Sequence, residues 1–211
     1  ILKKNKNNCI FKENTEVEKI ITNKNQVIGV KTNNEIIKTK EIIVCSGAWT
    51  SKIKNIEIKE VPIRPVKGQM VCLKIPKNIS LLKHILWREN VYLVPRNNSD
   101  LIIGATEEEM GYDKSLTVGG IYNLLKIARE VLPAIEDLSI VESWSGLRPT
   151  SRDDAPIIGP SKKLKGLIYA TGHHKNGILL APLTSSVIKN YYLNGNIGND
   201  FNNFEPGRFV I

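Results

Sequence analysis

The sequence predicts a mixed α/β (α+β) fold, and three observations lead to that prediction. The run Ile42–Cys45 is short, apolar and largely β-branched, which is typical of a strand covered on both faces in a parallel sheet. Residues 69–106 instead show strand-forming runs separated by turn residues, which favours an antiparallel sheet. Residues 167–194 combine a strand, a loop bracketed by glycines and a helical pattern.

The first part of the chain is predicted to consist of strands separated by polar turns. The expected strands are Val17–Thr22, Val27–Thr32, Glu35–Lys40 and Ile42–Cys45. The last of them stops at Ser46 and Gly47, and ligands of parallel sheets gather at the carboxyl ends of strands. Segment 46–49 is therefore a candidate binding position, and we expect Cys45 to act as a small buried hydrophobe.

The middle of the chain predicts a second kind of sheet together with one helix. Strands are expected at Gln69–Ile75, Val91–Pro95, Leu101–Thr106 and Ser139–Ser143. Residues 117–132 are apolar at helical spacing and stop before Pro133, which predicts a helix. Near the end of the chain, strand Leu167–Thr171, loop 172–177 and helix Ile178–Asn194 would bring free backbone N–H groups to one place, which suits an anion or an electron-rich ring.

Composition and charge exclude several classes of protein. The 211 residues are enough to bury a core, and no apolar run approaches the length of a membrane helix. The formal net charge is +9, but residues 1–83 hold 17 Lys and Arg against 7 Asp and Glu, whereas residues 84–211 hold 13 against 14. These lysines alternate with Asn and Ile and lack arginine forks and aromatics, so we expect no nucleic-acid partner. Three unpaired cysteines and three scattered histidines indicate a cytoplasmic protein without a metal site.

Three side chains stand out as candidates for binding. Arg148 precedes a proline that fixes the backbone, so its guanidinium either recognises a carboxylate or phosphate, or pairs with Asp153 or a neighbouring acid. Tyr92 alternates with Val91 and Leu93 and faces away from them, where its hydroxyl either reaches a ligand or packs across strands. Lys175 is either a surface cation, which the pattern favours, or a ligand contact. No nucleophile triad or paired acid is evident, and no residue is assigned as catalytic.

Six segments in order resemble one family. They are Cys45-Ser46-Gly47-Ala48-Trp49, Pro65-Val66-Lys67-Gly68-Gln69, Tyr92-Leu93-Val94-Pro95-Arg96, Gly104-Ala105-Thr106, Gly146-Leu147-Arg148-Pro149 with Pro156-Ile157-Ile158-Gly159, and residues 172–182. In this order they resemble the C-terminal part of the FAD-dependent D-amino-acid-oxidase superfamily, and within it the glycine oxidases of the thiamine-synthesis type. The resemblance implies a partial FAD-binding Rossmann-like domain, residues 1–55 and 146–211, and a substrate-binding domain with a large antiparallel sheet, residues 56–145.

The resemblance also implies roles for individual residues. Arg148 matches the arginine that holds the substrate carboxylate, and Tyr92 matches a tyrosine that assists it. Lys175 stands where glycine oxidases usually have an arginine, and Asn90 stands where a histidine can occur near the substrate. The matched FAD contacts are Val17, Gly47, His173, His174, Lys175, Asn176, Gly177, Ile178 and Leu179.

The implied reaction is FAD-dependent oxidative deamination of glycine or another small amino acid. Its substrates would be the amino acid and dioxygen, and its products the 2-oxo acid, ammonia and hydrogen peroxide, with a link to thiazole assembly in thiamine synthesis. Sarcosine oxidation, D-amino-acid dehydrogenation and an inactive fragment or binding module are the alternatives. FAD is expected to be noncovalent because no cysteine follows Cys72, and a homo-oligomer is compatible with the resemblance.

The pyrophosphate-binding motif of the family is a further expectation. Family members begin with a strand and a G-x-G-x-x-G loop, and that motif does not occur in these 211 residues. We therefore expect the sequence to be the C-terminal portion of a longer enzyme, incomplete and inactive by itself.

Overall fold

The computed structural model describes residues 9–57 and 59–209, and the chain divides into two units. The first unit comprises the residues up to Ile63 together with those from Ser151 onward, and the second unit comprises Arg64–Thr150. Both boundaries lie further along the chain than the predicted boundaries after residues 55 and 145. The reason is that strands β5 (Arg64–Lys74) and β9 (Ser139–Thr150) pair over their whole length and stay in one unit.

The first unit contains two small sheets. An antiparallel sheet is formed in chain order by β1 (Val17–Asn23), β2 (Gln26–Thr32) and β3 (Ile36–Lys38). The second sheet has the order β10-β11-β4, in which β11 (Leu167–Thr171) runs parallel to β4 (Ile42–Val44) and antiparallel to β10 (Ile157–Pro160). The parallel pairing of β4 confirms the prediction made from its apolar run.

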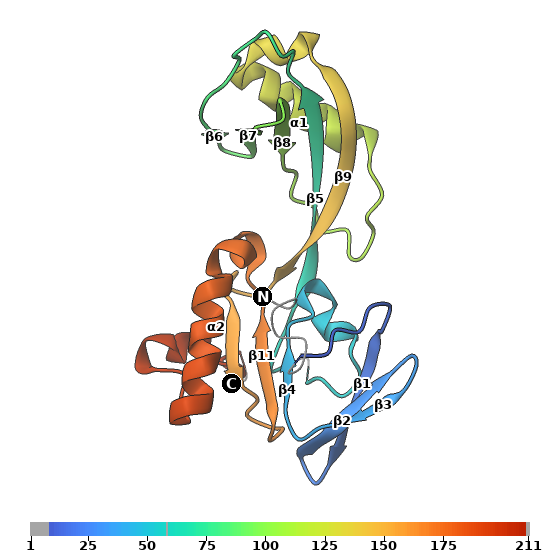
Figure 1. Cartoon of the computed structure of the whole chain (residues 1–211), viewed down its shortest axis with the longest axis vertical. Helices are drawn as coiled ribbons and strands as arrows, with labels where there is room; N and C mark the ends of the chain where they lie inside the picture. Colours follow the sequence, from blue (N-terminus) through green and yellow to red (C-terminus); the bar gives the residue numbers. More distant parts are fainter. Residues whose placement is uncertain (1–8, 58, 210–211) are drawn as a thin grey trace. The chain divides into compact units, whose positions relative to one another are not determined.

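One face of the β10-β11-β4 sheet is covered by helix α2 (Gly177–Asn194), which lies alongside β10 and β11 in Figure 1. Ile158 and Ile168 of the sheet form a buried cluster with Val187 and Ile188 of the helix. Gly195 caps the end of the helix with a left-handed φ of 74°. Glycine adopts this conformation without strain because it has no Cβ. Four short 3-10 helices complete the described structure: η2 (Gly47–Lys52), η3 (Pro133–Asp137), η4 (His174–Asn176) and η5 (Asn199–Phe204).

Strand β4 is less covered than its sequence predicts. Ile43 keeps 43% of its surface exposed, and Cys45 is exposed just beyond the end of the strand. Among the described residues β4 pairs with β11 alone, so it lies at an edge of the sheet. The prediction that Cys45 is buried is therefore wrong, because an apolar run reports the strand but not whether a neighbour covers it.

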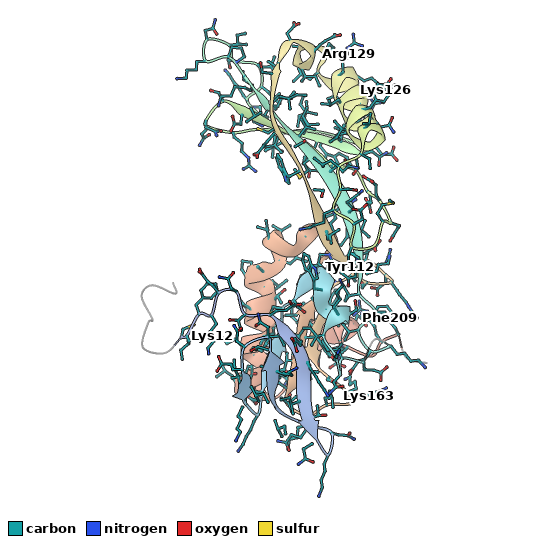
Figure 2. The ribbon with its side chains drawn as sticks, turned by 90° about the vertical axis from the view of Figure 1, so that its right-hand side faces the viewer. Lys12, Tyr112, Lys126, Arg129, Lys163 and Phe209 are labelled. Carbon is teal, nitrogen blue, oxygen red and sulfur yellow. The ribbon has the colours of Figure 1, made fainter. Side chains whose placement is uncertain are left out.

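The second unit is one antiparallel sheet with a helix on one face. The sheet has the order β6-β7-β8-β5-β9, where β6 is Leu86–Arg88, β7 is Val91–Pro95 and β8 is Asp100–Gly104. Helix α1 (Val118–Val131) packs its Leu124 and Ala128 against the sheet, and Figure 2 shows Lys126 and Arg129 on the outer side of this helix. Its first turn is capped by Thr117, whose hydroxyl accepts a hydrogen bond from the Gly120 N–H.

Strand β9 is much longer than the predicted strand Ser139–Ser143. It continues to Thr150 because every residue from Ser143 to Thr150 is paired with β5. Gly146 and Pro149 interrupt the strand pattern in the sequence, which concealed this extension. As a result Arg148 lies within a strand rather than in a loop.

Within the described residues, neither α1 nor α2 combines the length and the apolar character that crossing a bilayer requires. The same residues contain no group of three His, Cys, Asp or Glu side chains arranged to hold a metal ion.

The last part of the described chain is fixed by a bidentate ion pair. Arg208 Nε and Nη2 donate to the two carboxylate oxygens of Asp153 at 2.9 and 2.8 Å, and only 14% of the Arg208 side chain is exposed. The hydrogen bonds from Arg208 lower the pKa of Asp153 from 3.8 to about 2, although burial partly opposes the shift. Asp153 thus stabilises the fold above pH 3.8 and loses its contribution as the pH falls toward 2.

We expect Arg208→Ala to lower the free energy of unfolding by roughly 1–2 kcal/mol at neutral pH, because it removes hydrogen bonds to a charged group that is 43% exposed and so partly screened by solvent. The difference in unfolding free energy from wild type should shrink as the pH is lowered from 4 toward 2, because a protonated Asp153 no longer forms an ion pair with the arginine. Urea unfolding at several pH values measures this difference. Arg129→Ala is the control, since its pair with Glu136 is about 60% exposed on both sides and should contribute under about 1 kcal/mol. Equal effects of the two substitutions would contradict the assignment.

Candidate functional site

The face of the second unit's sheet that lies opposite α1 carries two of the predicted binding residues. Side chains alternate along a strand, and directly paired residues share a face. Val91 and Leu93 belong to the core under α1, so Tyr92 lies on the other face, which confirms its predicted direction. Tyr92 pairs with Gly104 of β8, and the register across β8 and β5 puts it on the same face as Met70. The two residues are part of one surface.

Arg148 reaches the same surface from the other side of β5. It pairs with Val66, and Gly68 and Met70 follow Val66 on that face at alternate positions of β5. The tyrosine from β7 and the arginine from β9 therefore approach β5 from opposite sides. Sequence reasoning selected both residues separately, and the structure brings them to one face.

The guanidinium of Arg148 is held by backbone carbonyls. Its Nη1 donates to the Thr106 carbonyl oxygen at 3.0 Å and to the Lys67 carbonyl oxygen at 3.3 Å. Asp153, the acid considered as its structural partner, pairs with Arg208 instead. Within the described part of the chain no carboxylate forms an ion pair with Arg148. Its charge is therefore directed but not neutralised, which suits the recognition of an anionic ligand.

Two glycines provide the space in which these side chains lie. A Cβ added at Gly68 would lie 2.5 Å from Arg148 Nη2 and 2.8 Å from its Cζ, so the guanidinium rests directly on this glycine. A Cβ added at Gly104 would lie 2.4 Å from the hydroxyl oxygen of Tyr92. Sequence reasoning did not assign a role to either residue. An isolated glycine within a strand pattern is the signal that could have found them, because it marks a close approach.

The polar ends of the two side chains lie over neighbouring strands of one sheet face. The Tyr92 hydroxyl lies 3.9 Å from Met70 Sδ and over Gly104 of β8, while the Arg148 guanidinium covers Gly68 of β5. A hydroxyl donor and a guanidinium on one face suit a small carboxylic acid.

Asn90 is not part of this pair. It occupies the turn that joins β6 and β7, with a left-handed φ of 66°, a conformation that asparagine tolerates better than most residues. It also lines a hollow of about 430 Å³ with Thr106 and with Leu124 of α1. The structure thus gives Asn90 a local role in a turn, and its contact with a substrate stays a prediction.

The carboxyl ends of β4 and β11 in the first unit form a second group of candidate residues. The two strands are parallel and adjacent, so their following loops start at the same edge. The hydroxyls of Thr50 and Thr171 lie 3.0 Å apart, and both donate to the Gly47 carbonyl oxygen, at 2.7 and 3.3 Å. Gly47 has a left-handed φ of 55°, and a Cβ added there would meet no atom within 4 Å. The hydroxyls thus fix the Gly47 carbonyl, while the space next to the Gly47 Cα is open.

Val17 lines a hollow next to this edge. The hollow has a volume of about 880 Å³ and is also lined by Val30, Val44, Ser46 and Trp49. It is large enough for a nucleoside-sized group, and it lies between β1 and the carboxyl end of β4. The residues present therefore fit one end of a dinucleotide such as FAD.

The loop predicted to approach the flavin begins at the end of β11 and leads into α2. His173 is buried, and its Nε2 lies 2.9 Å from the Thr184 hydroxyl. Burial lowers the pKa of His173, so its ring is neutral at pH 7 and ties the loop to the helix. His174 has a left-handed φ of 48°, and Lys175 and Asn176 are exposed.

The first turn of α2 exposes apolar side chains. Ile178 is 96% exposed and Leu179 77% exposed, and the preceding Asn176 makes no side-chain hydrogen bond to the helix. The start of α2 is the positive end of the helix dipole. An apolar surface beside such an end suits a flat ring that gains negative charge.

The chain resembles known proteins over most of its length. The model of the DAO family, described as FAD dependent oxidoreductase, matches residues 4–190 of this chain. The chain is 37% identical over 195 residues to the bifunctional protein ThiO/ThiG of Trichormus variabilis. The matched region covers 92% of this chain and 29% of that protein. It is 33% identical over 175 residues to glycine oxidase of Pseudomonas putida. This match covers 83% of this chain and 47% of that protein.

The solved structure of glycine oxidase from Geobacillus kaustophilus is also similar, with a TM-score of 0.80 and 31% identity over 92% of this chain and 52% of that one. The chain thus spans about half the length of these glycine oxidases. The predicted mixed fold of the D-amino-acid-oxidase type is confirmed. Because the family model matches most of its residues, the chain belongs to the DAO family of FAD-dependent oxidoreductases.

Proposed function

We propose that this chain supplies the substrate-binding sheet and part of the FAD-binding portion of an amino-acid oxidase that acts on glycine or another small amino acid. The observation that carries the proposal is the pair of Arg148 and Tyr92 on one sheet face, with the guanidinium held by two carbonyls and paired with no described carboxylate. The similarity to glycine oxidase supports the substrate class. A link to thiazole assembly in thiamine synthesis is part of the same proposal.

Binding in this account depends on the carboxylate of the substrate. Arg148 donates from its remaining N–H groups, and the Tyr92 hydroxyl adds a neutral hydrogen bond on the same face. The two contacts fix the carboxylate and thereby the direction of the Cα–H bond. The chain's contribution to the rate in this proposal is thus orientation of the substrate.

FAD would be bound noncovalently by residues of the first unit. Val17 and Gly47 would contact its adenosine end, and residues 173–179, including Lys175, would approach the ring. When bound, FAD supplies the acceptor for the hydride that leaves Cα, and dioxygen is the final oxidant. The amino acid, dioxygen and water then give the 2-oxo acid, ammonia and hydrogen peroxide.

Oxygen consumption by the FAD-loaded oxidase that contains this chain, called the FAD-loaded protein below, tests the proposal. Glycine, sarcosine, D-alanine and L-proline are compared in parallel, with peroxide and ammonia measured as products. We expect turnover with a small amino acid and one peroxide for each oxygen consumed. A preference for sarcosine would move the assignment to secondary amines, and reduction of an artificial acceptor without oxygen uptake would indicate a dehydrogenase. No reaction with any of these amines would contradict the proposal.

A further inference from the structure

A buried lysine and a partly buried glutamate form an ion pair directly behind the surface that carries Arg148. The Lys67 side chain is 0% exposed, and its Nζ lies 3.2 Å from the Glu108 carboxylate, whose side chain is 24% exposed. Nζ also donates to the Ser115 carbonyl oxygen at 3.1 Å. Lys67 precedes Gly68 on β5, so its side chain lies on the face opposite Arg148. A buried lysine is costly unless it is paired, and here the pair is complete.

Gln69 extends this pair to the start of α1. Its Nε2 donates to Glu108 Oε1 at 2.8 Å and to the Thr117 hydroxyl at 2.9 Å, and its Oε1 accepts from the Thr117 N–H at 2.9 Å. The contact is close, because a Cβ added at Gly120 would lie 2.2 Å from Gln69 Nε2. Every polar atom of the Gln69 side chain is thus engaged in a defined position.

Glu108 remains ionised within this cluster. Burial by itself raises the pKa of the Glu108 carboxyl, but hydrogen bonds from Thr106, Gln69 and Lys67 outweigh burial and hold the pKa below its ordinary value. The carboxylate therefore accepts from three side chains at neutral pH.

The same contacts fasten segment 106–108 along β5. The Lys67 N–H donates to the Glu108 carbonyl oxygen at 2.9 Å, and the Glu108 N–H donates back to the Lys67 carbonyl oxygen at 3.0 Å. The Gln69 N–H donates to the Thr106 hydroxyl at 2.8 Å. The Lys67 and Thr106 carbonyl oxygens are also the two acceptors of Arg148 Nη1. The buried cluster and the substrate arginine thus share one piece of backbone.

We propose that Lys67, Gln69 and Glu108 are positioning residues, which hold the Lys67 and Thr106 carbonyls so that Arg148 presents a fixed guanidinium to the substrate carboxylate. The identity of that ligand rests on the proposed function, whereas the fixing of Arg148 does not. Misplacing a binding group by about 1 Å can cost on the order of 100-fold in rate, so a device of this kind has a measurable effect. A cluster with only a structural role would change stability and leave the arginine's mobility unaltered.

Glu108→Gln tests the proposal in the FAD-loaded protein. We expect KM for the amino acid to rise about 10- to 100-fold, while kcat at saturation changes much less. The Nη groups of Arg148, followed by ¹⁵N NMR, should give separate signals in the wild type and averaged signals in the variant, because rotation about Nε–Cζ is released. Unchanged KM together with unchanged Arg148 signals in a folded variant would overturn the proposal.

Two further variants make the result decisive. Glu109→Gln is the matched control, because this neighbouring carboxylate pairs with Arg64 and is 61% exposed. It should leave KM and the Arg148 signals as in the wild type, and an effect equal to that of Glu108→Gln would count against the proposal. If Glu108→Gln does not fold, Lys67→Met combined with Glu108→Gln removes both charges of the pair together, so that no unpaired lysine is left buried. This double variant should fold and still release Arg148, and retention of the separate signals would contradict the inference.

The two proposals fail in different ways. If the wild type shows separate Arg148 signals that Glu108→Gln averages, but oxidises no amino acid, the positioning role stands and the proposed function falls. If the wild type turns over an amino acid and Glu108→Gln changes neither KM nor the signals, only the positioning role falls.

Discussion

Replacing Arg148 with alanine is expected to raise KM for the amino acid by on the order of 100-fold or more, because a charged hydrogen-bonded partner of the carboxylate is lost. Arg148→Lys should recover only part of this loss, since a lysine keeps the charge but lacks the planar fork that the Thr106 and Lys67 carbonyls orient. Steady-state kinetics over a wide range of substrate concentrations measures both variants.

Arg152→Ala is the control for this prediction, because Arg152 is an exposed arginine four positions further along the chain. It should leave KM close to the wild-type value. If Arg148→Ala also keeps the wild-type KM while the protein remains folded, Arg148 does not bind the substrate carboxylate.

A single methyl group at Gly68 is expected to be almost as harmful. The Cβ of Gly68→Ala would lie 2.5 Å from Arg148 Nη2 and 2.8 Å from Cζ, distances that force the guanidinium off the strand. Arg148 should then lose its fixed place over β5, and KM should rise by roughly 10- to 100-fold with a smaller change in kcat. The same kinetic assay is used, with circular dichroism to establish that the sheet is intact.

Gly146→Ala provides a closely matched comparison. Gly146 pairs directly with Gly68 across β5 and β9, yet a Cβ added there meets no atom within 4 Å. Both substitutions restrict one strand glycine, and only one of them displaces the arginine. Equal kinetics for the two variants would show that the space above Gly68 is not needed for binding.

Local patterns predicted those parts of the fold that local forces determine. The helix at 118–131 follows from apolar residues at helical spacing between a Thr cap and Pro133, and the structure has it within one residue of the prediction at each end. The outward direction of Tyr92 follows from strand alternation alone. In both cases the neighbours along the chain contain the necessary information.

Long-range pairing explains what was missed. The extension of β9 through Gly146 and Pro149 depends on β5, which lies about 80 residues earlier in the chain. The same pairing keeps all of β9 in the second unit, so that this unit ends at Thr150, five residues beyond the predicted boundary. The burial of Lys67 was equally hidden, because its partner Glu108 lies about 40 residues later in the chain.

The candidate site was predicted in its chemistry more than in its construction. Arg148 was chosen for its setting before Pro149, but the carbonyls that hold its guanidinium belong to Lys67 and Thr106, which no spacing rule connects with it. The roles of Val17 and residues 173–179 came from resemblance, and they stay predictions until a flavin is observed. A Cβ at Gly47 would meet no atom within 4 Å, and Ile178 at the start of α2 is 96% exposed, so both positions are open in the described structure.

Anaerobic reduction of the bound flavin tests the central claim most directly, namely that the face carrying Arg148 and Tyr92 binds an amino acid for oxidation. The FAD-loaded wild type and Arg148→Ala are mixed with glycine, sarcosine or D-alanine in a stopped-flow instrument without oxygen. We predict that at least one of these amino acids bleaches the oxidised-flavin absorbance of the wild type with saturating kinetics, and that Arg148→Ala needs on the order of 100-fold more of it. An absorbance unchanged by all three, or the same concentration dependence in both proteins, would contradict the account.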